Sequence, residues 1–367
     1  MINRFGSLKE QEEGYSNPKD IDFSVKDLLK KLSNSDINKI LKIYEAKKIN
    51  IKDKKAVLLL TMHYNELMNH DEQKNIYTSL IDYLSDENRK IVIKPHPADT
   101  IWDYDKIFKG SKVINRYMPA EIFPYCLNNK FEKGITCWST SIYNLKDILK
   151  SIVNFDTRID KTYKDFDKYY AVVEFLNTIK SEKKINIIFK EINEIQFEKL
   201  LEKYIKDYKK YFTFDENEIN SIYITNKKDN SLINKKVISL EYDINSKNYI
   251  HIKRKTKEKE EDVFISIYNI DNINKLSVKK DLKYSNKTII INNINEEEHK
   301  DILLNIVKKQ NDNTEKKIKK YEDKIAKLEK EIQEKNKKLE GIYTSTSWKV
   351  TKPIRKMGDI IRKIKNN

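Results

Sequence analysis

Two short apolar runs decide the fold: Ala56-Val-Leu-Leu-Leu-Thr61 and Lys90-Ile-Val-Ile-Lys94, with a helical pattern over 72–84 between them. Short aliphatic runs bounded by polar residues are typical of strands that are buried on both faces. Further strand-like runs follow at 112–115, 134–136 and 151–155, and helical stretches separate them. This alternation predicts a parallel, Rossmann-like α/β domain, in which ligands bind at the carboxyl ends of the strands.

Beyond this domain the hydrophobic pattern changes. A largely helical stretch at about 160–210 leads into runs of alternating polar and apolar residues at 237–244, 249–253, 262–270 and 288–291. Period-2 alternation predicts strands, so we expect a small, β-rich second module.

The fold class expected is therefore α/β, with a Rossmann-like parallel sheet, a small β-rich module and a C-terminal coiled-coil helix. The sequence divides into a polar and helical segment at 1–55, the Rossmann-like domain with a helical extension at 56–210, the β-rich module at 215–300, a coiled coil at 301–342 and a basic amphipathic tail at 343–367.

The coiled coil is predicted from a heptad stripe. Apolar residues with a 3-4-3-4 spacing, interrupted once by Lys335, are Ile318, Tyr321, Ile325, Leu328, Ile332, Leu339 and Ile342. This pattern favours self-association through 314–342 as a parallel dimer, and the alternative is a single solvated helix that packs back on the domain. In the tail, Ile354, Met357, Ile361 and Ile364 share one helical face with basic flanks, which is typical of a segment lying on an acidic membrane surface.

Composition limits the classes of function. The net charge of +16 is uneven, because 301–367 contributes 19 basic and 10 acidic residues, or +9. A specific nucleic-acid groove is not indicated, and only a weak, salt-sensitive association would be expected. The chain's six glycines form neither a GxGxxG nor a P-loop motif. Its two cysteines suggest neither a disulfide framework nor a zinc site, so we expect no metal and a reducing, cytoplasmic location.

The motif Lys94-Pro-His-Pro97 directly follows a predicted strand. Residues before proline are biased to extended backbone, so His96 should be held stiffly at the carboxyl end of the sheet. An imidazole beside Lys94 suits an anionic phosphate, to which it can donate a hydrogen bond or a proton. The alternative is a histidine held in a turn for structural reasons.

A second candidate is the stretch Gly134-Ile-Thr-Cys-Trp-Ser-Thr-Ser141, in which Ser139, Thr140 and Ser141 open a predicted helix. Hydroxyls and backbone N–H groups at a helix N-terminus favour anions. Ordinary N-capping is the alternative, but the expected position at the same sheet edge as His96 favours phosphate binding.

These motifs, together with Pro119-Ala-Glu121 and Glu12-Glu13-Gly14, resemble those of the bacterial sialyltransferases and polysialyltransferases of the GT-B type, which include the lipooligosaccharide sialyltransferase family. The resemblance covers about 10–155. It implies the C-terminal half of a GT-B fold, with 1–55 as a remnant of the acceptor half and most of the N-terminal domain lacking. It also implies inverting transfer of sialic acid from CMP-sialic acid to a glycan hydroxyl.

The resemblance also implies roles for single residues. One carboxylate of Glu12 or Glu13 would deprotonate the acceptor, and His96 would protonate or bind the leaving CMP phosphate. The nucleotide-binding set would consist of Lys94, His96, Pro97, Glu121, Ser139, Thr140, Ser141 and Thr61. No cofactor is implied beyond the CMP-sugar donor, and related enzymes with an HP motif use CMP-Kdo or CDP-glycerol.

The expected partners are therefore a nucleotide sugar and a glycan acceptor, in capsule or lipooligosaccharide assembly at the inner membrane face. The alternative function is a catalytically degenerate, donor-binding scaffold of a glycan-synthesis complex.

Overall fold

The computed structural model describes residues 25–46, 49, 55–64, 68–86, 89–157, 160–227, 230–270, 273–351, 353, 354, 356 and 357. It divides the chain into two compact units, Met1–Glu296 and Glu297–Asn367. The candidate residues Glu12 and Glu13 lie outside the described residues, as do twelve residues of the basic tail, Ile361 and Ile364 among them.

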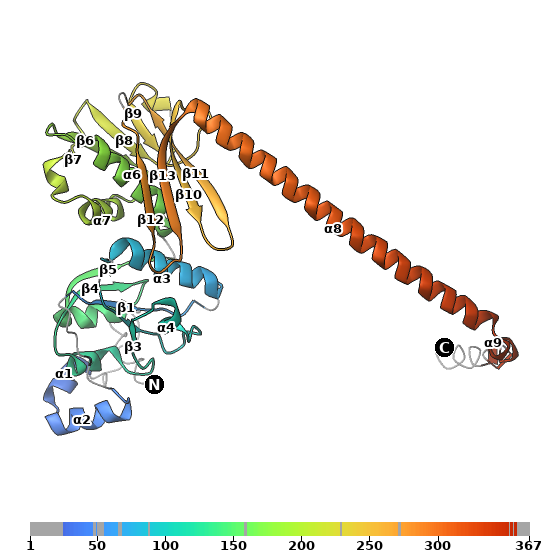
Figure 1. The fold of residues 1–367 in the computed structure, drawn as a ribbon. Helices are drawn as coiled ribbons and strands as arrows, with labels where there is room; N and C mark the ends of the chain where they lie inside the picture. The colour runs from blue at the N-terminus through green and yellow to red at the C-terminus, as the bar shows by residue number, and fades with distance from the viewer. Residues whose placement is uncertain are drawn as a thin grey trace, which may run out of the picture. The chain divides into compact units, whose positions relative to one another are not determined.

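The first sheet of unit 1 has five parallel strands in the order β3-β2-β1-β4-β5 (Figure 1). The strands are β1 (Val57–Leu60), β2 (Ile91–Lys94), β3 (Lys112–Val113), β4 (Phe131–Thr136) and β5 (Leu149–Asn154). The predicted parallel α/β sheet is thus confirmed, with a strand at each predicted run. Every residue of β1 is buried, as its unbroken aliphatic sequence requires for a central strand.

Short helices surround this sheet. They are α1 (Val25–Lys31), α2 (Asn34–Ile43), α3 (His70–Leu84), α4 (Tyr104–Ile107) and α5 (Phe123–Cys126), with 3₁₀ helices η2 (Ala120–Ile122), η3 (Thr140–Ile148) and η4 (Thr162–Lys164). The longest of them, α3, begins with a capping box, because the Asn69 side chain accepts the Glu72 N–H and the Glu72 carboxylate accepts the Asn69 N–H.

The second sheet of unit 1 has eight strands in the order β12-β13-β10-β11-β9-β8-β6-β7. They are β6 (Ile185–Lys190), β7 (Phe212–Thr213), β8 (Ser221–Thr225), β9 (Lys236–Ser239), β10 (Asn248–Lys255), β11 (Glu260–Tyr268), β12 (Ser277–Asp281) and β13 (Thr288–Asn295). Helices α6 (Phe166–Ile179) and α7 (Glu194–Tyr204) and 3₁₀ helices η5 (Tyr208–Lys210) and η6 (Asn230–Leu232) complete this region.

This sheet starts earlier in the chain than the sequence pattern indicates. The stretch at 160–210 was expected to be largely helical, but it contains β6, which pairs in parallel with β7 and β8. The sequence of β6, Ile-Asn-Ile-Ile-Phe-Lys, is apolar and β-branched, and it is too short to show either period clearly.

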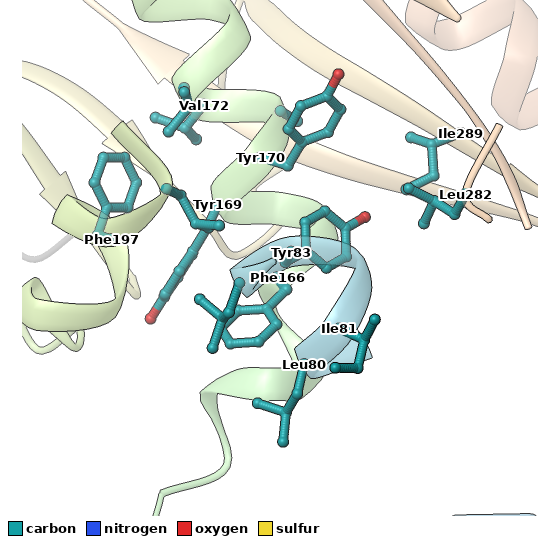
Figure 2. Close-up of a cluster of buried hydrophobic side chains, with 14 of the residues drawn as sticks. Leu80, Ile81, Tyr83, Phe166, Tyr169, Tyr170, Val172, Phe197, Leu282 and Ile289 are labelled. Carbon is teal, nitrogen blue, oxygen red and sulfur yellow. The ribbon is translucent and has the colours of Figure 1, made fainter. Parts of the chain in front are cut away.

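The two sheets share one hydrophobic core (Figure 2). Figure 2 shows Tyr83 of α3 against Phe166 and Tyr170 of α6, with ring centroids 5.7 and 5.9 Å apart. Two buried carboxylates strengthen this junction. The Tyr83 hydroxyl donates to Asp167 Oδ1 at 2.5 Å, and the backbone N–H groups of Tyr284 and Ser285 both donate to Asp82 at 3.1 Å.

Helix α8 (Glu296–Thr344) is a continuous helix of 49 residues, and α9 (Thr346–Val350) follows it. At 1.5 Å per residue α8 is about 73 Å long. The predicted C-terminal helix is therefore present, and its heptad stripe is exposed to solvent. Within the described ranges, no helix is both long and apolar enough to cross a membrane.

Candidate functional site

The sequence motifs meet at the carboxyl ends of three neighbouring strands. Thr61 follows the central strand β1, the Lys94–Pro97 motif begins at the last residue of β2, and Ser139 lies three residues beyond the end of β4. In the sheet, Leu60 is opposite both Lys94 and Thr136. Because neighbouring strands are about 4.8 Å apart, this register brings the motifs to one edge.

The loop that carries His96 is organised by a buried carboxylate, Asp99. The Thr61 hydroxyl donates to Asp99 Oδ2 at 2.6 Å and accepts the His96 backbone N–H at 3.0 Å. The Asp99 N–H in turn donates to the His96 carbonyl at 3.0 Å. Thr61 is 2% exposed, so its side chain supports the loop from beneath.

Asp99 also accepts hydrogen bonds from side chains of two helices. The Tyr104 hydroxyl donates to Asp99 Oδ2 at 2.5 Å, and Gln73 Nε2 donates to Oδ1 at 3.4 Å. The Ile101 N–H also donates to Oδ1, at 3.0 Å. Sequence analysis missed Asp99, and the only signal was an acidic residue two positions after Pro97.

The loop fixes the protonation pattern of His96. The Ala98 N–H donates to His96 Nδ1 at 3.2 Å, so the neutral ring carries its proton on Nε2 as a hydrogen-bond donor. Burial lowers the pKa of His96, and the nearby His63 and Lys94 lower it further. The His63 ring stacks with that of His96 at a centroid distance of 6.1 Å. At neutral pH His96 is therefore a neutral donor.

Two cationic side chains lie beneath the loop. Lys94 Nζ donates to the carbonyls of Pro95 and Arg116, both at 2.8 Å. Burial lowers the pKa of Lys94 to about 8, and Arg116 contributes to this shift. The Arg116 guanidinium donates to the carbonyls of Asp99 and Ile101. The carboxylates of Asp99 and Glu121 lie near these cations, so the sheet edge carries charges of both signs.

Arg116 also positions an exposed aromatic ring. Its guanidinium carbon lies 3.3 Å from the ring centroid of Trp102, whose side chain is 69% exposed. A cation held against a tryptophan face at this distance is an attractive contact. The position of Arg116 under this loop is a long-range feature that sequence analysis also missed.

The Ser/Thr motif leads into η3, so the predicted helix is present, as a 3₁₀ helix. Trp138 has a φ of 78°, which is costly for a residue with a side chain, and its N–H donates to Asn154 Oδ1 at 3.1 Å. The Ser139 N–H donates to Thr136 Oγ1 at 3.2 Å, and the Ser139 side chain makes no capping hydrogen bond. The Ser139 side chain therefore does not act as the N-cap of η3.

Glu121 connects this motif with Lys94. Its Oε1 accepts a hydrogen bond from Asn144 Nδ2 of η3 at 3.1 Å, and its charge partly offsets the lowering of the Lys94 pKa. Pro97 is exposed at the tip of the loop and Ser139 and Ser141 are half-buried, while Thr140 is exposed. The structure thus brings Lys94, His96, Glu121 and the Ser/Thr motif to one region.

Comparison with known proteins agrees with these motifs. Residues 22–155 match the family model described as Alpha-2,8-polysialyltransferase (POLYST). The matched segment spans all five strands of the first sheet and the loops that carry His96 and Ser139, and it begins after Glu12 and Glu13. No significant match is found among curated proteins or solved structures. Over residues 22–155 the chain is similar to the alpha-2,8-polysialyltransferases, which confirms the resemblance of the motifs and supports a glycosyltransferase activity of the sialyltransferase type.

Proposed function

We propose that the chain transfers sialic acid, or a related sugar, from a CMP-activated donor to a hydroxyl group of a glycan. The observation that carries this proposal is the neutral His96, whose Nε2–H is a donor at the carboxyl edge of a parallel sheet above buried Lys94. In open α/β sheets this edge is where nucleotides bind. The polysialyltransferase match over the same residues supports the choice of donor.

The main task of these residues is to stabilise the phosphate group that leaves. The bond between the anomeric carbon of the sugar and the phosphate oxygen breaks, and that oxygen keeps the electron pair. His96 Nε2–H donates to the leaving phosphate, while the hydroxyls of Ser139, Thr140 and Ser141 donate to its other oxygens. Fixed donors aimed at developing negative charge are the strongest catalytic device available to such a site.

The acceptor hydroxyl oxygen forms the new bond to the anomeric carbon and loses its proton to a base. Glu12 or Glu13 is the proposed base, from the resemblance of the Glu12-Glu13-Gly14 motif. Thr61 acts as a positioning residue for His96, and Glu121 orients η3 and binds the nucleoside. The proposed acceptor is a surface glycan, such as capsule or lipooligosaccharide, assembled at the inner face of the membrane.

A second candidate is a donor-binding scaffold without transfer activity. The family match covers 22–155, which contains the donor-binding motifs and not the acidic pair, and a chain that binds the donor without this base would be such a scaffold. The two functions separate when CMP-sialic acid is incubated with the chain and sialylated acceptor glycans. Transfer of the sugar favours the enzyme, whereas CMP binding with neither transfer nor hydrolysis favours the scaffold.

Calorimetric titration of CMP into the full chain tests the site directly. Wild type is expected to bind, and His96→Ala should weaken binding by about tenfold or more, because a charge-assisted hydrogen bond to phosphate is lost. His70→Ala is a matched control, since His70 is exposed and contacts Thr100. Absence of CMP binding by folded wild type, or equal losses in both variants, contradicts the proposal.

The pH dependence of CMP affinity reports on Lys94. Its pKa of about 8 means that the ammonium loses its proton as pH rises through this value. CMP phosphate is already a dianion there, because its second pKa is about 6. We expect CMP affinity to fall between about pH 7 and pH 9. Lys94→Gln keeps hydrogen-bond donors but cannot titrate, so its CMP affinity should be weaker and flat over this range. A flat profile in wild type would show that Lys94 does not contribute to phosphate binding.

A further inference from the structure

The apolar stripe of α8 is longer than the segment from which the coiled coil was predicted. Leu304 and Val307, at 56% and 52% exposure, continue the same 3-4 spacing upstream of Ile318 through Asn311 and Thr314. In the usual heptad notation the a positions are Leu304, Asn311, Ile318, Ile325, Ile332 and Leu339, and the d positions are Val307, Thr314, Tyr321, Leu328, Lys335 and Ile342.

Nine of these positions are large apolar side chains, each between 47% and 65% exposed. A stripe of exposed apolar side chains, interrupted only at Asn311, Thr314 and Lys335, indicates an interaction surface. We propose that this stripe is the seam of a parallel, in-register homodimer, in which α8 of one copy pairs with α8 of a second copy.

The charges beside the seam identify the partner as a second copy. In a parallel two-stranded coil, a g residue faces the e residue of the following heptad of the partner. Lys317 then faces the partner's Glu322, and Lys324 faces the partner's Glu329. Two-fold symmetry repeats both contacts, so the dimer gains four interchain pairs of opposite charge.

The same residues disfavour an antiparallel pair. In that arrangement g positions face g positions and e positions face e positions. The g positions include Lys317, Lys324 and Lys338, with Glu331 as the exception, whereas the e positions include Glu315, Glu322 and Glu329, with Lys308 as the exception. An antiparallel homodimer centred on Glu322 therefore places Glu315, Glu322 and Glu329 of the two copies against one another, and like charges at close range are destabilising.

The core positions favour two strands in one register. β-branched residues occupy three consecutive a positions, Ile318, Ile325 and Ile332, and Leu328 occupies a d position between them. Isoleucine at a with leucine at d favours dimers, and a single asparagine at an a position, here Asn311, fixes register because it pairs with its own copy. Lys335 at a d position lowers stability, so the dimer should dissociate measurably.

Parallel pairing determines which ends of the two α8 helices meet. It brings Glu296 of both copies to one end of the coil and Thr344 of both copies to the other end.

Analytical ultracentrifugation of the full chain tests the pairing. Wild type should be a dimer at micromolar concentration. The double variant Lys317→Glu with Lys324→Glu makes all four contacts repulsive, so the dimer Kd should rise by at least about tenfold. Glu322→Lys with Glu329→Lys should act in the same way, and an equimolar mixture of the two variants should form a heterodimer.

A matched control has the same charge change away from the seam. Lys316→Glu with Lys320→Glu alters f and c positions and should leave the dimer unchanged. For direction, Ile342→Cys should crosslink to itself under mild oxidation, since only a parallel, in-register pair places both copies of residue 342 together, and Lys337→Cys should not. The proposal is overturned if wild type is a monomer, if the charge substitutions leave the dimer Kd unchanged, or if Ile342→Cys forms no crosslink.

Discussion

Replacing Asp167 with alanine is expected to lower the free energy of unfolding by about 3–5 kcal/mol, because it leaves partners of a buried carboxylate unpaired. Asp167 accepts the Tyr83 hydroxyl through Oδ1, while its Oδ2 lies 2.7 Å from Arg254 Nε and 2.9 Å from Lys287 Nζ. Its side chain is 6% exposed, so water cannot replace these contacts without opening the core. The carboxylate thus holds together α3, which carries Tyr83, β10, which carries Arg254, and the turn before β13, which carries Lys287.

Denaturant unfolding of the full chain, followed by circular dichroism, measures this effect. Lys150→Ala is the control, because Lys150 pairs with Glu132 at 2.8 Å on the surface and its side chain is 56% exposed. Exposed pairs contribute about 0–1 kcal/mol, so the control should be nearly neutral. Similar losses of unfolding free energy in Asp167→Ala and Lys150→Ala would show that the buried contacts of Asp167 stabilise the fold no more than an exposed ion pair does.

Asp99→Ala is expected to cost about 3 kcal/mol and to abolish detectable CMP binding. The substitution removes the acceptor of the Thr61 and Tyr104 hydroxyls, the Ile101 N–H and Gln73 Nε2. Each buried donor left unsatisfied costs about 1–3 kcal/mol, although relaxation of the loop recovers part of this. The Thr61 hydroxyl would also be free to turn away from the His96 N–H, so the imidazole would lose its fixed direction.

Two further variants distinguish an effect on the geometry of the His96 loop from an effect on the free energy of unfolding. Asp99→Asn keeps an acceptor of the same shape and should retain most of the stability. Thr61→Val removes only the hydroxyl between Asp99 and the His96 N–H, so it should weaken CMP binding more than its effect on unfolding explains. Unchanged CMP affinity in folded Asp99→Ala would mean that the loop does not depend on this carboxylate.

The parallel sheet was predictable because β1 and β2 are buried on all sides and therefore have unbroken aliphatic sequences. The same reasoning misses β12, an edge strand whose sequence Ser-Val-Lys-Lys-Asp is half exposed, and places β6 in a helical stretch. His96 was identifiable because two prolines flank it. Asp99 was not, because its role depends on Thr61, Gln73 and Tyr104, which come from the loop after β1, from α3 and from α4.

The core that joins the two sheets has a consequence for interpreting genetic data. The match to the polysialyltransferases ends at residue 155, yet Tyr83 packs on Phe166 and Tyr170, and Leu282 and Ile289 belong to the same cluster. Unit 1 should therefore melt in one cooperative transition rather than sheet by sheet. A lesion at Leu282 would leave each folded molecule fully competent but reduce how many such molecules a cell contains. A screen that scores only the total amount of the proposed transfer activity would count such positions among the catalytic ones, and measuring protein abundance would distinguish them.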